Sequence, residues 1–141
     1  MHRAEHSEVA AAPVGECFEA VLDFAAYPEW SASVLAADVI ESGPESRVVE
    51  FRVDAKVRHI RYVLRYFWEE PVRVWWDYVE GDARDVSGEY RFEALDRERT
   101  RLTYRLAIDP GRFVPGPVKR VLTDTVMRGS VKDLKTRVER G

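Results

Sequence analysis

The clearest pattern in the chain is the alternation of hydrophobic and charged positions over residues 47–57. Val49, Phe51 and Val53 lie on one side of this segment, and charged residues such as Glu50 lie on the other. A period of two predicts a β-strand with one buried face. Similar patterns predict further strands over 34–41, 59–69, 72–79, 86–92 and 102–108, and a short segment of small residues over 4–11 completes a set of seven.

A helical pattern separates the first strand from the others. Pro13 suits the first turn of a helix, and hydrophobic residues then recur at helical spacing at Val14, Cys17, Phe18, Val21 and Leu22. Asp23 is a candidate cap for a second short helix. Because the residue before a proline disfavours α geometry, we expect the helix pair to end or kink at Tyr27 and Pro28.

The end of the chain predicts one long amphipathic helix over 118–140. Its apolar stripe consists of Val118, Leu122, Val126, Val131, Leu134 and Val138. About 23 residues at the helical rise make a helix of roughly 34 Å. Gly129 costs about 1 kcal/mol against alanine, and close packing of a strand is favoured over a kink or a ligand contact as its explanation. The preceding residues 110–117 hold three prolines and two glycines and predict a loop.

These elements together predict an α+β fold. A seven-stranded antiparallel sheet must bury one face, and the long terminal helix is its natural cover. Two short helices lie between the first and second strands. Neighbouring strands twist by roughly 20–25°, so the sheet is expected to curve around the helix. Any space between the sheet and the helix is the candidate site.

Composition excludes several classes of protein. Of the 141 residues, 45% are hydrophobic and 33% are charged, which is unlike disordered or collagen-like chains. Cys17 is the only cysteine, so no disulfide can form within the chain. No apolar run approaches the roughly 20 residues of a membrane span, and residues 1–30 lack the pattern of a signal peptide. A cytoplasmic location is therefore expected.

Charge is unevenly distributed, although the net charge is only −3. Residues 1–50 hold ten acidic and two basic residues, whereas residues 112–141 hold eight basic and three acidic residues. Mutual attraction within the fold is the favoured explanation, ahead of an acidic ligand or a membrane surface.

The order of the elements, together with the segments 18–23 (FEAVLD) and 27–30 (YPEW), resembles the helix-grip superfamily, which includes START lipid-transfer domains and the birch pollen allergen. Within it the chain is most similar to the polyketide cyclase/dehydrase and coenzyme Q-binding branch. Residues 88–92 (GEYRF), 100–106 and the terminal helix extend the similarity over nearly the whole chain. The resemblance implies a single helix-grip domain over 1–141 with a ligand cavity. It supports the fold more than any one chemistry, because such folds host many functions.

Signatures of catalysis or cofactor binding are missing from the sequence. There is no nucleotide-binding glycine motif, no zinc-hydrolase motif and no cluster of Cys and His, so no cofactor and no metal are expected. His2 and His6 have helical ligand spacing, but they lie in the first strand or a frayed end, which makes metal binding improbable. His59 is expected to be a solvated residue on the outward face.

Aromatic residues are the remaining signal. The chain has four Trp, six Tyr and six Phe, and seven of these lie within residues 62–78. On the inward face each ring either packs as core or lines a cavity, and core is favoured for any single ring. For the set, a cavity is favoured, because apolar ligand sites have rigid aromatic walls with few polar groups. The candidate ligand-binding residues are Trp30, Phe51, Tyr62, Tyr66, Trp68, Trp76, Tyr78, Tyr90, Phe92, Tyr104, Leu122 and Val126.

Three functions remain open from the sequence. The leading hypothesis is binding of a hydrophobic small molecule such as a lipid, a quinone or a polyketide, with Trp30 and the 110–117 loop near the entrance as the resemblance implies. The second is a polyketide aromatase/cyclase, for which tyrosines could donate hydrogen bonds. No general base is convincing for it, because Asp54, Asp77 and Glu89 are expected on the outward faces of the strands. The third is an interaction protein like the ribosome-association toxins of the same branch. It would use the basic residues Lys119, Arg120, Arg128, Lys132, Lys135, Arg137 and Arg140. No nucleic-acid partner is expected, and an oligomer is possible.

Overall fold

The computed structural model of the chain describes residues 2–54, 59–109, 111 and 116–140, with the backbone alone described for residues 2 and 116–123. Within this part of the chain the strands are β1 (His2–Ala10), β2 (Val34–Ser42), β3 (Arg47–Asp54), β4 (His59–Glu69), β5 (Arg73–Gly81), β6 (Asp85–Ala94) and β7 (Thr100–Asp109). The helices are α1 (Val14–Leu22), the 3-10 turn η1 (Phe24–Ala26), α2 (Tyr27–Trp30) and α3 (Gly116–Glu139). The predicted order of elements is confirmed.

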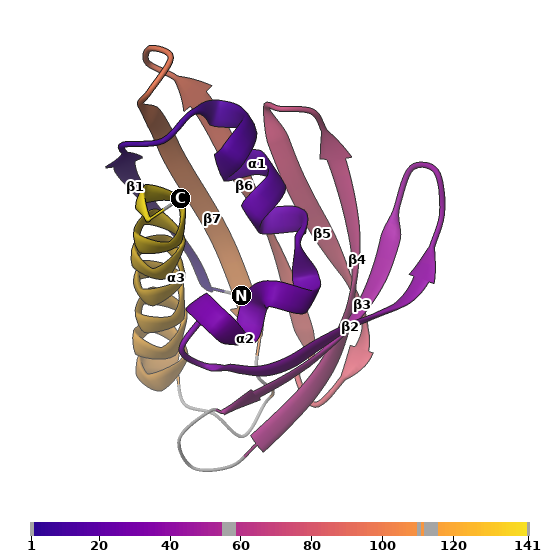
Figure 1. Cartoon of the computed structure of the whole chain (residues 1–141). Coiled ribbons are helices and arrows are strands. Elements are labelled where there is room, and N and C mark those ends of the chain that lie inside the picture. The colour runs from indigo at the N-terminus through magenta and orange to yellow at the C-terminus, as the bar shows by residue number, and fades with distance from the viewer. Residues whose placement is uncertain (1, 55–58, 110, 112–115, 141) are drawn as a thin grey trace.

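These strands form one antiparallel sheet in the order β1-β7-β6-β5-β4-β3-β2. Strands β2 to β7 follow one another as a meander, and the connection through α1, η1 and α2 carries the chain from one edge of the sheet to the other (Figure 1). At the β2 edge, the pairing with β3 shifts register between Val34 and Ala36 and again between Val39 and Glu41. The alternating segments of the sequence therefore account for the whole sheet.

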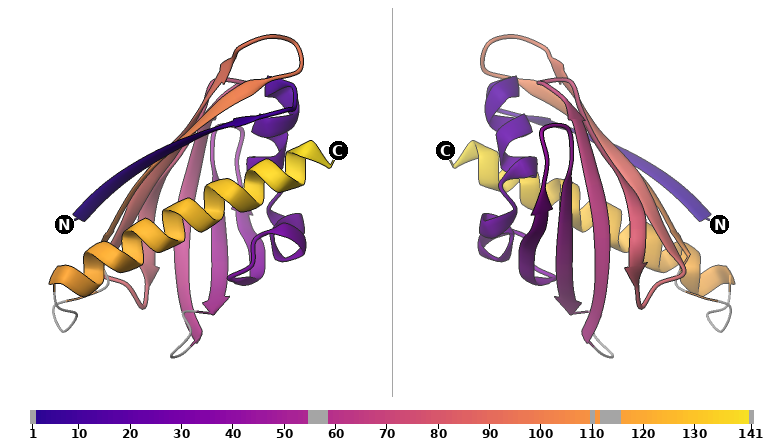
Figure 2. Two further views of the ribbon diagram at one scale, coloured as in Figure 1. Left: turned by 90° about the vertical axis from the view of Figure 1, so that its left-hand side faces the viewer. Right: turned by 90° about the vertical axis from the view of Figure 1, so that its right-hand side faces the viewer.

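Helix α3 crosses one face of the curved sheet obliquely, and α1 and α2 cover the same face (Figure 2). The 24 residues of α3 correspond to about 36 Å of helix. A single hydrophobic core lies between the sheet and these helices. Hence the fold is the predicted sheet wrapped around a terminal helix. No helix in the described residues is long and apolar enough to cross a membrane.

The expected break at Tyr27 and Pro28 is wrong. Tyr27 has φ −51° and ψ −44°, and helix α2 runs through Pro28 to Trp30. Two contacts explain this geometry: the Tyr27 hydroxyl donates a hydrogen bond to the carbonyl of Val21 at 2.5 Å, and its ring packs 5.6 Å from that of Phe24. Tertiary contacts thus override the local preference of the residue before proline.

Helix α3 also begins earlier than expected. Its first residues are Gly116 and Pro117, which were assigned to the loop. Proline is tolerated in the first turn of a helix, because a backbone N–H at that position would have no acceptor within the helix. Most of the expected loop, and Ala55 and Val57 of the strand predicted over 47–57, lie outside the described residues. Close packing at Gly129 is not found, since a Cβ built there would meet no atom within 4 Å.

Candidate functional site

The aromatic residues predicted on the inward face of the sheet lie in the core or pack against it, so this face is confirmed. Phe51, Tyr66, Trp76, Tyr90, Phe92 and Tyr104 belong to the buried core, and Tyr62, Trp68 and Tyr78 are partly buried against it. The register places these rings in cross-strand pairs, with Tyr66 opposite Trp76 and Tyr90 opposite Tyr104. Side chains on paired strands meet directly, so the rings form a continuous layer beneath the helices.

The rings in the middle of this layer pack tightly against one another. The centroid of Tyr66 lies 5.2 Å from that of Trp76, and Trp76 lies 5.7 Å from Tyr104. Tyr104 in turn meets Tyr90 edge to face at 4.3 Å. The middle of the interior is therefore occupied by the protein's own side chains. A ligand must bind beside this ring layer or displace part of it.

Gly88 makes room for the largest of these rings. A Cβ at Gly88 would lie 2.8 Å from Cζ2 of Trp76 and 2.5 Å from the carbonyl oxygen of Arg105. Real Cβ atoms do not approach that closely, and the Arg105 carbonyl belongs to the paired strand and has little freedom to move. The absence of a side chain at position 88 on β6 thus allows the Trp76 indole to lie flat against the sheet.

Several polar groups of this layer have no hydrogen-bond partner. The hydroxyls of Tyr27 and Tyr78 donate to the carbonyls of Val21 and Ala83, both at 2.5 Å. By contrast, no hydrogen bond within the described part of the chain is found for the hydroxyls of Tyr62, Tyr66, Tyr90 and Tyr104. The Trp76 indole nitrogen is the one fully buried polar side-chain atom there without a partner. Buried tyrosine and tryptophan normally satisfy these groups. They are therefore available to a ligand or to ordered water.

These hydroxyls stay protonated over the physiological range. Burial raises the pKa of Tyr62 to about 12. Burial and, to a smaller extent, the neighbouring phenols raise the pKa values of Tyr66 and Tyr90 well above the ordinary value of 10. These hydroxyls can donate hydrogen bonds to a carbonyl or an enolate, but they cannot act as bases at neutral pH.

No charged side chain is buried on this side of the sheet in the described residues. The buried polar residues there are Ser31 and Thr100, and the one buried carboxylate, Glu89, lies on the outward face. This agrees with the prediction that Asp54, Asp77 and Glu89 point outward. The part of the interior formed by the described side chains is consequently uncharged.

One end of the interior is less tightly closed. Ile60, Tyr62, Tyr78, Ala83 and Ile108 pack against the core but remain partly exposed. They come from β4, β5, β7 and, for Ala83, the turn between β5 and β6. These ends of the strands lie toward the start of α3, as Figure 1 shows. Tyr62 joins this end to the ring layer, because its ring stacks on Phe51 at 5.5 Å. The ring layer is thus partly exposed at this end of the sheet.

Helix α3 turns most of its predicted apolar stripe toward the sheet, with one exception at Val126. Met127, Val131, Leu134 and Val138 are buried, whereas Val126 is 36% exposed. Met127 takes the inward place beside Val126, since consecutive helix positions point about 100° apart. The role of Val126 in ligand binding stays a prediction. The side chain of Leu122 lies outside the described residues.

Trp30 lies away from the ring layer, at a crevice between α2 and α3. The crevice has a volume of about 390 Å³ and is lined by Glu29, Trp30, Asp133, Thr136, Arg137 and Arg140. Asp133 Oδ2 accepts a hydrogen bond from the Ala32 amide at 3.0 Å, and Arg137 pairs with Glu29 at 3.3 Å. Trp30 packs against the edge of the core, where its ring lies 4.7 Å from that of Tyr27. Sequence patterns did not indicate this crevice, because its residues are distant in the chain.

The comparisons with known proteins agree with this architecture. The profile of the family described as "Polyketide cyclase / dehydrase and lipid transport" matches residues 1–139. No curated protein matches the sequence.

Solved structures share the fold at low identity. A START superfamily protein from Mycobacterium smegmatis has a TM-score of 0.90 at 20% identity, with 99% of each chain covered. The Zhui aromatase/cyclase from Streptomyces sp. R1128 has a TM-score of 0.86 at 20% identity, over 99% of this chain and 94% of that one. A STAR-related lipid transfer protein from Xanthomonas axonopodis has a TM-score of 0.78 at 15% identity, over 96% and 85%. At such identities the likeness concerns the fold.

Proposed function

Since the chain belongs to the polyketide cyclase/dehydrase and lipid transport family, we propose that it binds an uncharged hydrophobic molecule between its sheet and helix α3. The observation that carries this proposal is the group of four tyrosine hydroxyls without partners, those of Tyr62, Tyr66, Tyr90 and Tyr104. Among the described residues, the Trp76 indole nitrogen is the one fully buried polar side-chain atom without a partner, so the tyrosine oxygens keep some contact with solvent. A ligand with oxygen acceptors would replace the water that such hydroxyls otherwise bind.

The surroundings define the chemistry of this ligand. Buried charge is missing from this side of the described sheet, so a charged ligand would lose its hydration without gaining a counterion. A quinone, a polyketide or a lipid ester has both an apolar body and neutral oxygen acceptors. Removing some 300 Å² of apolar ligand surface from water contributes roughly 7 kcal/mol before the cost of association. Hydrophobic burial would supply the affinity and the phenols would orient the ligand.

The partly exposed end beside Ile60, Tyr62 and Ile108 is the place where such a molecule would first bind. From there its apolar part can reach the ring layer through Tyr62 and Phe51. The tight contacts from Tyr66 to Tyr104 mean that deeper binding requires rings to change rotamer. The ligand would therefore dissociate slowly if its binding displaces these rings. It would exchange quickly if it binds beside them.

A second candidate function is polyketide cyclisation with loss of water. Clustered neutral phenols can stabilise a developing enolate, and a shaped cavity can hold the chain in a reactive geometry. The phenols of Tyr62 and Tyr66 supply such donors, but no buried carboxylate or histidine accompanies them in the described residues. Binding is the better supported of the two functions.

Native mass spectrometry of freshly purified protein tests the binding function directly. A co-purified apolar ligand, or saturable quenching of tryptophan fluorescence by a naphthoquinone such as menadione, is the expected result. Replacing Tyr62 by Phe should weaken quinone binding about 2- to 10-fold by removing one hydrogen bond. The matched control is Tyr27→Phe, whose hydroxyl is already used by Val21 and which should leave quinone affinity unchanged. A ligand-free spectrum without quenching by quinones or by a fatty acid would refute the proposal.

Turnover distinguishes the second function from the first. A linear poly-β-ketone mimic incubated with the protein should cyclise to an absorbing aromatic product only if the protein is a cyclase. The rate should then fall in Tyr66→Phe. Bound but unchanged mimic would support a binding protein alone.

A further inference from the structure

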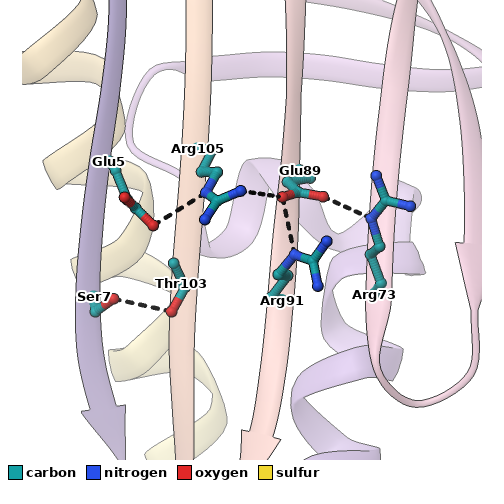
Figure 3. A network of polar contacts seen from close by, with 7 residues as sticks. All are labelled: Glu5, Ser7, Arg73, Glu89, Arg91, Thr103 and Arg105. Atoms are coloured by element: carbon teal, nitrogen blue, oxygen red, sulfur yellow. Dashed lines mark hydrogen bonds and ion pairs between the residues drawn. The ribbon is translucent and has the colours of Figure 1, made fainter.

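The outward face of the sheet holds the one charged residue that is buried among those described, Glu89 on β6. Its carboxylate accepts hydrogen bonds from Nε of Arg73 at 2.6 Å, Nε of Arg91 at 3.0 Å and Nη1 of Arg105 at 3.3 Å (Figure 3). Burial alone would favour the neutral acid, but the hydrogen bonds from Arg73 and Arg91 hold the pKa of Glu89 below its ordinary value. Glu89 is therefore an ionised centre shared by three guanidinium groups.

The three arginines carry more donors than Glu89 can use. Arg105 also donates from Nε to Glu5 at 3.0 Å, so two carboxylates face three guanidinium groups. The three guanidinium groups have six terminal nitrogens, Nη1 and Nη2 of each arginine. Among these, only Nη1 of Arg105 has a hydrogen bond within the described chain. Moreover, Arg73 lies directly opposite Arg91 in the β5–β6 register, and like charges at such positions repel. The cluster is consequently short of negative charge.

Neighbouring aromatic rings hold part of this cluster in place. The Arg73 guanidinium lies over the Trp75 ring at 4.2 Å, and Trp75 stacks with Phe67 at 5.8 Å. Contacts of this kind fix the guanidinium before any ligand arrives. An anion binding there would lose little side-chain entropy.

A groove of about 730 Å³ lies directly beside the cluster. Its floor is made of small residues, Ser87 and Gly88 on β6 and Ala107 on β7, and Trp75 and Arg3 border it. Strand β5 pairs with β6 only from Arg73 to Trp76, so the two strands separate beyond that point. Four arginines and three carboxylates, Glu5, Asp77 and Glu89, line the groove, which leaves one positive charge in excess. The protein as a whole has a net charge of −3.

We propose that this groove is a second binding site, for a molecule that carries a carboxylate or phosphate group. The oxyanion would take the free terminal nitrogens of Arg73, Arg91 and Arg105, and the rest of the molecule would lie over Ser87 and Ala107. Guanidinium groups suit this role, because two parallel N–H groups match the two oxygens of a carboxylate or phosphate. The site lies on the opposite face of the sheet from the ring layer and does not depend on the function proposed for the interior. The same oxyanion chemistry occurs in soluble metabolites and in phospholipid headgroups.

Titration with inorganic phosphate and with citrate, followed by NMR of the arginine Nε–H groups at low salt, tests the site. Saturable shifts are expected for Arg73, Arg91 and Arg105 and for the Trp75 indole. Arg91→Gln should weaken binding at least tenfold. Arg101→Gln is the matched control, because Arg101 lies on the same face of β7, pairs with Glu93 at 2.6 Å and does not line the groove. Equal weakening in both variants would refute the proposal in favour of non-specific attraction.

A second variant tests the groove without altering charge. Ser87→Leu should fill the floor and abolish citrate binding while the three arginines remain. If Arg91→Gln fails to fold, Arg91→Lys keeps the charge but loses the paired donors, and it should still bind citrate more weakly than the wild type. Unchanged citrate affinity in Ser87→Leu, or in the folded Arg91 variant, would overturn the proposal.

Vesicles distinguish the two sources of the oxyanion. If the natural ligand is a lipid headgroup, the wild-type protein should bind vesicles of phosphatidylcholine with phosphatidylglycerol. The Arg91→Gln variant should not bind them. Shifts with citrate and phosphate but no vesicle binding would identify a soluble ligand. No saturable response to any of the three probes would refute the site.

Discussion

Tyr90 and Tyr104 face each other across β6 and β7 with their rings 4.3 Å apart and at 89°. The edge-to-face contact is favourable for aromatic pairs, yet neither hydroxyl has a hydrogen-bond partner in the described part of the chain. The two rings therefore stabilise the core through their faces and edges, while their polar ends remain free. Each tyrosine thus contributes its ring to the core and leaves its hydroxyl available to a ligand, which is the basis of the proposed binding function.

Tyr104→Phe should change stability very little. The substitution removes an oxygen that has no partner and keeps the ring, so the free energy of unfolding should stay within about 0.5 kcal/mol of the wild type or rise. Tyr27→Phe is the comparison, because it removes a hydrogen bond to Val21 and should cost about 1 kcal/mol. Urea denaturation measures both. A loss above 1 kcal/mol for Tyr104→Phe would show that its hydroxyl is already bonded.

Gly88→Ala should destabilise the protein by about 1–3 kcal/mol. The new Cβ would overlap the Arg105 carbonyl at 2.5 Å and the Trp76 ring at 2.8 Å, and neither can move freely. Chemical denaturation gives the loss of stability, and near-ultraviolet circular dichroism should show the displaced indole. An unchanged midpoint would mean that the Trp76 ring does not lie against Gly88.

Gly129→Ala should have the opposite effect. A Cβ at this exposed position of α3 meets no atom within 4 Å, so only the helix propensity changes. The free energy of unfolding should rise by about 1 kcal/mol. Thermal denaturation should show a raised melting temperature, and a lowered one would indicate a close contact or a functional break in the helix.

Alkaline pH should unfold the protein through its tyrosines. The pKa of Tyr62 is about 12 in the folded protein because of burial, against an ordinary value of 10. Between these pH values the unfolded chain loses the proton that the folded chain keeps, so the unfolded state is favoured. The contribution to stability is complete below pH 10 and is lost as the pH rises toward 12. Tyrosinate absorbance near 295 nm should therefore appear together with the loss of circular dichroism, and ionisation in a folded protein at pH 10 would contradict this.

The strands and the terminal helix could be predicted because their hydrophobic periods are long and unbroken. The alternation over Val49, Phe51 and Val53 has one interpretation, and the inward rings from Tyr62 to Tyr104 follow from the same parity. The register shift between Val63 and Leu64 did not reverse these faces. Period thus sufficed for six of the seven strands and for the chemical character of the inner layer, whereas β1 was predicted from a short segment of small residues.

Other features depend on contacts that no local pattern contains. Val126 and Met127 are adjacent apolar residues, and only the docking of α3 decides which of them points inward. Glu89 was correctly placed outward, but its burial arises from arginines on three different strands, which the cross-strand register brings together. Likewise, the absence of partners for four tyrosine hydroxyls is a property of the assembled interior.

The two register shifts along β2 affect how the protein behaves at high concentration. A straight terminal strand would offer an unbroken row of amide and carbonyl groups to a neighbouring molecule, which is the usual start of fibril growth. In β2 the irregularities near Ala36 and Glu41 interrupt that row, and Asp38 and Glu41 add negative charge along it. Although the sheet has an open edge at β2, the protein is therefore expected to stay dispersed in solution without another element covering that edge.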